Sequence, residues 1–96
     1  MRAYFAADAE LLGRLREGGT YTGDLQVATS DDELDEFDAM TAAAQPDRAV
    51  VAVEVDQPHQ PVGLADVAAF HVDADGSGDL AWYAAEEIDQ VVGLLG

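Results

Sequence analysis

The chain has 96 residues, enough for one domain, and it carries 20 Asp and Glu against four arginines and no lysine, a net charge of −16. Because binding to phosphates needs Lys and Arg to displace counterions, this balance excludes direct binding to nucleic acid or to an anionic membrane surface. It favours a cationic partner such as a basic protein surface, and it equally fits a chain that is acidic only for solubility or for a salt-rich cytoplasm.

The residue types that are missing exclude further chemistry. The chain has no cysteine, so disulfides, thiolate catalysis and thiolate metal sites are excluded. No apolar run approaches the ~20 residues of a membrane span. The opening MRAYFAADAE turns acidic within its first ten residues, unlike a signal peptide. We therefore expect a cytoplasmic protein.

The first elements expected are a strand, a helix and a short strand. Residues 2–6 form an apolar run typical of a buried strand. Asp8 is the expected N-cap of a helix that ends at Gly18-Gly19, and residues 25–28 suit a short strand. The apolar positions of this helix recur at helical spacing: Leu11, Leu12 and Leu15.

The second helix has the clearest sequence signals. Ser30 and Glu33 have the spacing of a capping box, with Ser30 as N-cap, and Pro46 stops the helix. An apolar stripe follows the box and predicts the buried face of the helix. Its members are Leu34, Phe37, Met40, Thr41 and Ala44.

The second half of the chain alternates strand and turn signals. Strands are predicted at 48–55, 67–72 and 80–84, and the Gly-rich segment 73–79 joins the last two as a hairpin turn. Residues 86–95 close the chain as an amphipathic helix. The apolar positions of that helix are Ile88, Val91, Val92 and Leu95, and we expect them to pack beside the stripe of the second helix.

The element order is thus β-α-β-α-β-β-β-α over a single acidic domain, residues 1–96. A late hairpin makes the sheet at least partly antiparallel, so the predicted class is α+β, with a small sheet and about three helices packed on one of its faces.

Four segments resemble an uncharacterised family of short acidic actinobacterial proteins. They are the opening MRAY, the strand VVAVEV at 50–55, and DVAAFHVD at 66–73 followed by LAWYAAEEI at 80–88. The likeness covers about half of the chain and rests on strand and helix-start residues. It implies a fold and a bacterial setting, and it carries over no functional residue.

Enzyme and metal signals are weak. Segment 73–79 places Asp73, Asp75 and Ser77 as a calcium loop would, but Ala84 stands where the bidentate Glu is required. The two histidines, His59 and His71, lie in different elements and form no ligand pair. No phosphate-binding glycine motif is present. We expect no enzyme, no cofactor and no metal site. A third hypothesis, a small hydrolase or metal-dependent enzyme, requires that His71 and several acids converge in a cleft.

The most informative segment is 31–38, which has six acids in eight residues on the second helix. Acids at i, i+4 lie ~5–6 Å apart on a helix, a spacing comparable with that of DNA phosphates. We therefore expect a non-enzymatic binding protein, in its sharpest form a DNA-mimic inhibitor of a nucleic-acid-binding defence protein. The alternative is a chromosomal housekeeping protein, actinobacterial or halophilic, that is acidic for solubility. The expected partner-binding residues are Asp31, Asp32, Glu33, Asp35, Glu36 and Asp38, extended by Asp73, Asp75 and Asp79.

Overall fold

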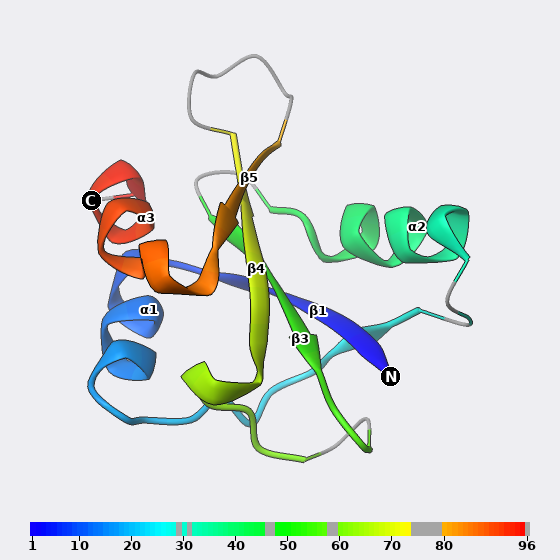
Figure 1. Cartoon of the computed structure of the whole chain (residues 1–96), viewed down its shortest axis with the longest axis horizontal. Helices are drawn as coiled ribbons and strands as arrows, with labels where there is room; N and C mark the ends of the chain where they lie inside the picture. Colours follow the sequence, from blue (N-terminus) through cyan, green and yellow to red (C-terminus); the bar gives the residue numbers. More distant parts are fainter. Residues whose placement is uncertain (29, 31, 46–47, 58–59, 74–79, 96) are drawn as a thin grey trace.

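The computed structural model of the chain describes residues 1–28, 30, 32–45, 48–57, 60–73 and 80–95 (Figure 1). Within them, five antiparallel strands form one sheet in the order β2-β1-β3-β4-β5. The strands are β1 (Arg2–Ala7), β2 (Gln26–Val27), β3 (Ala49–Glu54), β4 (Val67–Val72) and β5 (Ala81–Ala84). The helices are α1 (Ala9–Arg16), α2 (Glu33–Ala43) and α3 (Ile88–Leu95), with 3₁₀ turns η1 (Leu64–Asp66) and η2 (Ala85–Glu87). The predicted α+β class and element order are confirmed.

Most local signals work as the sequence predicts. The Asp8 carboxylate accepts the backbone N–H of Leu11 at 2.8 Å and so caps α1. The chain leaves α1 through Gly18, whose φ of +96° suits a residue without a side chain. The last helix starts at Ile88 rather than 86, because Ala85–Glu87 winds as a 3₁₀ turn in which Glu87 Oε1 accepts the N–H of Ala84 at 2.9 Å.

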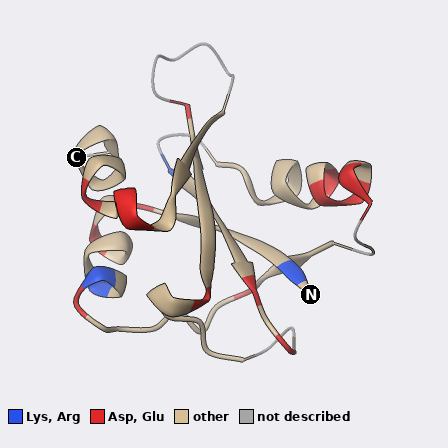
Figure 2. Ribbon diagram, viewed as in Figure 1, with Lys and Arg blue, Asp and Glu red and all other residues tan. Residues whose placement is uncertain are grey.

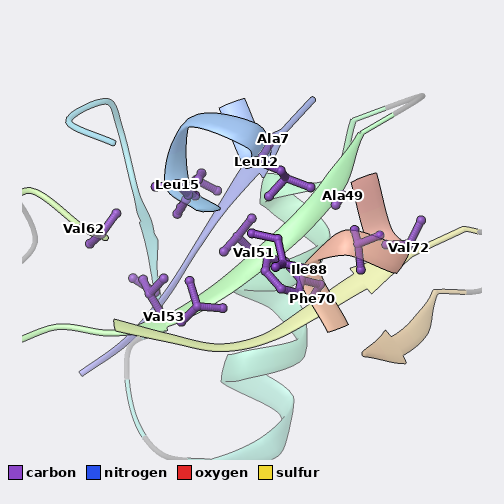
Figure 3. Close-up of a cluster of buried hydrophobic side chains, with 14 of the residues drawn as sticks. Ala7, Leu12, Leu15, Ala49, Val51, Val53, Val62, Phe70, Val72 and Ile88 are labelled. Atoms are coloured by element: carbon purple, nitrogen blue, oxygen red, sulfur yellow. The ribbon is translucent and has the colours of Figure 1, made fainter. Parts of the chain in front are cut away.

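The larger core lies between the sheet and the pair α1 and α3, which run side by side (Figure 1). A row of cross-strand partners, Phe5, Val51, Phe70 and Tyr83, crosses four strands on this face. Figure 3 shows Leu12 and Leu15 of α1 and Ile88 of α3 closing over the sheet. Burial of these side chains is the main stabilising contribution to the fold.

A smaller core lies on the opposite face, under α2. It joins Tyr4, Val50 and Ala52 of the sheet to Ala39 and Ala43 of the helix. The expectation that all helices pack on one face is therefore wrong. The physical reason lies in β3, whose residues Ala49–Val53 are all buried: a strand that is apolar on both faces needs cover on both.

Helix α2 also faces the other way from its prediction. Leu34 is 73% exposed and Phe37 is 58% exposed, while Ala39 and Ala43 are the buried residues. Of the predicted stripe, Met40 alone packs against this core, so the stripe as a whole is not the packing face. It also cannot meet α3, because α3 packs on the opposite face of the sheet.

The N-cap prediction needs a correction as well. Asp32, not Ser30, is the N-cap of α2, and its Oδ1 accepts the N–H of Leu34 at 2.8 Å. Ser30 acts one step earlier, since its hydroxyl oxygen accepts the N–H of Asp32 at 3.0 Å. An aspartate caps as well as a serine does, so both residues satisfy the sequence rule and the geometry selects one.

An irregular register in β4 changes which residues share a face. Pairing shifts between Ala52 and Val53 of β3, so Val67 joins Phe70 in the larger core instead of lining up with Ala69. Regular alternation along strand 67–72 predicts one face shared by Val67, Ala69 and His71, and this prediction is wrong for Val67. A bulge of this kind inserts one residue and reverses the alternation beyond it.

Candidate protein-interaction site

The densest group of acids lies on the first half of α2 and on the residue before it, as Figure 2 shows in red. Asp32, Glu33 and Asp38 are exposed, and Asp35 and Glu36 are half-buried on the flank that turns toward the sheet. These acids are thus unequal in access, because α2 packs through the side that carries Asp35 and Glu36.

Some of these acids stabilise the start of α2. Asp32 caps α2, and Asp35 Oδ2 accepts a hydrogen bond from the Ser30 hydroxyl at 2.6 Å. Acids in a first turn also interact favourably with the positive end of the helix dipole. Asp38 lies beyond the first turn and is exposed, so neither role accounts for it.

The charge of this group is not compensated within the fold. Arg2 Nε lies 2.6 Å from Glu54 Oε1, and Arg16 Nη1 lies 2.7 Å from Asp89 Oδ1. Among the described residues, no acid of α2 forms an ion pair. Burial, reinforced by the negative charge of Glu36, raises the pKa of the Tyr4 phenol under the helix. The outer face of α2 is therefore a local concentration of unneutralised negative charge.

Two large apolar side chains that the apolar stripe placed in the core lie instead among these acids on the surface. Leu34 and Phe37 lie one turn apart and point away from the sheet. Thr41 continues the line at the next turn, with its hydroxyl donating to the Phe37 carbonyl at 2.9 Å. The sequence signal that could have identified this surface is a pair of alanines at i, i+4, Ala39 and Ala43, which lies on the side of the helix opposite Leu34 and competes for the buried face.

Of the remaining predicted partner residues, the structure describes Asp73 alone. Asp31, Asp75 and Asp79 lie outside the described residues, as does the part of segment 73–79, weighed above as a calcium loop, that follows Asp73. Asp73 is exposed and directly follows β4, whose end lies away from the start of α2 (Figure 1). The described part of the candidate site is consequently α2 with its cap.

Acids also occur on other parts of the molecule. Figure 2 shows them beside α1, on η2 and at the start of α3, and near the lower ends of β3 and β4. These positions surround the sheet on more than one side. The negative charge is therefore distributed over the molecule, with a local maximum at α2.

Two observations bear on an enzyme or metal site in the described part of the chain. No three His, Asp or Glu gather there as metal ligands would. A shallow hollow is lined by Leu64, Ala65, Val67, Ala85 and Glu86, a set that offers one carboxylate and no nucleophile or imidazole.

His71 is a half-buried sheet residue, placed opposite Trp82 across the β4–β5 ladder. Burial, with a smaller effect of the Arg2 charge, lowers the pKa of its imidazole below the ordinary value. Trp82 is 62% exposed, since α2 covers the β2, β1 and β3 part of this face and not β5.

None of the described helices has the length and apolar character that a bilayer crossing requires. Comparison with protein-family models, with curated proteins and with solved structures found no match.

Proposed function

We propose that this chain is a non-enzymatic, cytoplasmic binding protein that presents the outer face of α2 to a basic protein surface. One observation carries the proposal: α2 concentrates five carboxylates, Asp32 included, that no cation of the described chain neutralises. A field of this sign raises the local concentration of cationic partners and speeds their association.

The sharpest form of the proposal is that the partner is a nucleic-acid-binding protein whose DNA site α2 occupies. Its lysines and arginines would pair with the exposed carboxylates Asp32, Glu33 and Asp38. Binding would then follow the rules of protein–DNA association with the roles reversed: steep loss of affinity with salt, and competition by duplex DNA.

A second function is favoured by the distribution of charge in Figure 2. Acids around several elements are what a protein needs to stay soluble and monomeric, with no dedicated face. Under this alternative the chain is a housekeeping protein, and neutralising α2 has no more effect on any partner than neutralising another region.

The test compares two variants with equal loss of charge. The first is Asp32→Asn, Glu33→Gln, Asp38→Asn on α2, where Asn at position 32 preserves the cap. The matched control is Glu10→Gln, Glu17→Gln, Glu86→Gln, three exposed acids from the layer of α1 and α3. Both are titrated against a panel of purified basic nucleic-acid-binding proteins, at several salt concentrations and with duplex DNA as competitor.

We expect at least one panel member to bind, and the α2 variant to lose about ten-fold or more in affinity, ~1.4 kcal/mol, while the control loses much less. Competition by duplex DNA supports the mimic form; binding without competition restricts the proposal to a basic protein surface of another kind. Equal losses in the two variants, or no binding to any panel member, favour the housekeeping alternative.

A further inference from the structure

Five large apolar side chains are notably exposed in the described structure, and two of them share one helix face. Leu34 is 73% exposed and Phe37 58%, and they lie at i, i+3 on α2. The others are separate: Met1 precedes β1, Trp82 lies on β5 and Leu94 lies on α3. Single exposed apolar residues are normal on protein surfaces, whereas neighbouring ones mark interaction sites.

The fold makes no use of this pair. Helix α2 packs on the sheet through Ala39 and Ala43, and Leu34 precedes Ala43 by about two and a half turns, which places it on the opposite side. Phe37 follows Leu34 on the same outer face. The helix therefore packs through Ala39 and Ala43, with Met40 partly buried beside them, while the two large apolar residues Leu34 and Phe37 face solvent.

The surroundings of the pair determine what can cover it. Glu33 and Asp38 are exposed immediately beside Leu34 and Phe37, and no cation of the described chain pairs with them. A second copy of the chain would bring these acids against each other at a net charge of −16 per molecule, which like-charge repulsion opposes. The complementary occupant has an apolar centre with cationic groups around it.

We infer that the occupant is a basic amphipathic segment of another protein, whose apolar stripe receives Phe37 and Leu34 while its Lys and Arg meet Glu33, Asp38 and Asp32. This inference rests on the proposed function and adds the partner's chemistry to it. Aromatic anchors at the centre of an interface, ringed by polar contacts, are the usual source of binding energy. An apolar stripe pairing with a helix face is one of the recurring recognition modes.

The inference differs from phosphate mimicry in a measurable way. A surface that imitates phosphates binds through charge alone, so its affinity vanishes when salt shortens the Debye length to ~3 Å at about 1 M. Apolar contact is not weakened by screening. Binding through Phe37 and Leu34 therefore leaves a salt-resistant component.

The experiment uses the whole chain and two synthetic helical peptides of equal length and equal lysine content. In one, leucines recur at i, i+3, i+4, i+7; in the other, alanines replace them. The chain variants are Leu34→Ala/Phe37→Ala and the matched control Trp82→Ala/Leu94→Ala, which removes two exposed apolar side chains elsewhere. Dissociation constants are measured at about 0.1 M and about 1 M salt, and thermal melts check that each variant is folded.

We expect the parent chain to prefer the leucine peptide by about ten-fold or more, and to retain that binding at high salt. The Leu34/Phe37 variant should lose the preference, and the Trp82/Leu94 control should keep it. Equal affinity for the two peptides overturns the inference, as does a preference that survives Leu34→Ala/Phe37→Ala or disappears in the control.

The α2 charge variant described above separates this inference from the proposed function. If neutralising Asp32, Glu33 and Asp38 weakens binding to both peptides but the apolar variant has no effect, the inference fails and the proposed function stands. If that charge variant binds as the parent does, the proposed function fails and the inference fails with it. If neither peptide binds, the inference fails, and the panel of basic proteins decides the proposed function.

Discussion

The three phenylalanines of the chain provide a direct test of how α2 is oriented. Phe70 lies on β4, the strand between β3 and β5, and is fully buried. Phe5 is 2% exposed, and its ring stacks on Tyr21 at a centroid distance of 4.0 Å. Phe37 is 58% exposed on the outer face of α2. Each of the three phenylalanines is replaced by alanine in a separate variant.

The expected losses follow from burial. Removing a buried phenylalanine costs ~3–5 kcal/mol, because the transfer free energy is lost and a cavity remains. That is a large part of the roughly 5–15 kcal/mol by which domains are stable. Less than half of the Phe37 side chain is covered, and alanine is a better helix former by about 0.5 kcal/mol. Phe37→Ala should therefore change the free energy of unfolding by no more than about 1 kcal/mol.

Urea denaturation followed by circular dichroism measures all three variants under one condition. Phe70→Ala and Phe5→Ala should move the midpoint far toward low denaturant, with Phe37→Ala close to the parent. A loss above about 2 kcal/mol for Phe37→Ala would mean that α2 packs through its Leu34–Phe37 side. That result would refute the orientation of the helix and, with it, the exposed surface on which both proposals rest.

Two further predictions concern charge. Raising salt from about 0.1 M to about 1 M should raise the melting temperature, because screening weakens repulsion among the acids. Neutralising Asp32, Glu33 and Asp38 should reduce that rise. A melting temperature that does not change with salt contradicts the repulsion. Burial lowers the pKa of the half-buried His71, so as the pH falls the unfolded chain takes up a proton at this residue before the folded chain does. The contribution of His71 to stability is therefore present above pH ~6.5 and is lost as the pH falls through the folded pKa. As the pH is lowered from about 7.5 to about 5, denaturant melts should show a loss of unfolding free energy in the parent that the His71→Gln variant lacks. Parallel pH profiles of parent and variant would count against this role of His71.

The sequence alone determined the elements. Strand 67–72 is predicted with the observed bounds, and the helix cap at Asp8 forms as expected, because each depends on residues within a few positions of one another. The amphipathic C-terminal helix is equally local, and Ile88 and Val91 are buried as its period predicts. The acids of segment 31–38 were likewise predicted to lie on the second helix, which carries the candidate site.

Which face of α2 is buried was decided by the tertiary structure. Its sequence has two apolar stripes on opposite sides, and the one with larger side chains, Leu34 and Phe37, has the stronger hydrophobic signal. The sheet under α2 presents Tyr4 and Val50, and Ala39 and Ala43 pack in the same cluster, with Met40 partly buried beside it. Packing depends on the shape of both surfaces, and one of them comes from distant parts of the chain. The exposed apolar pair at the candidate site is therefore a property of the fold, which periodicity within the helix did not predict.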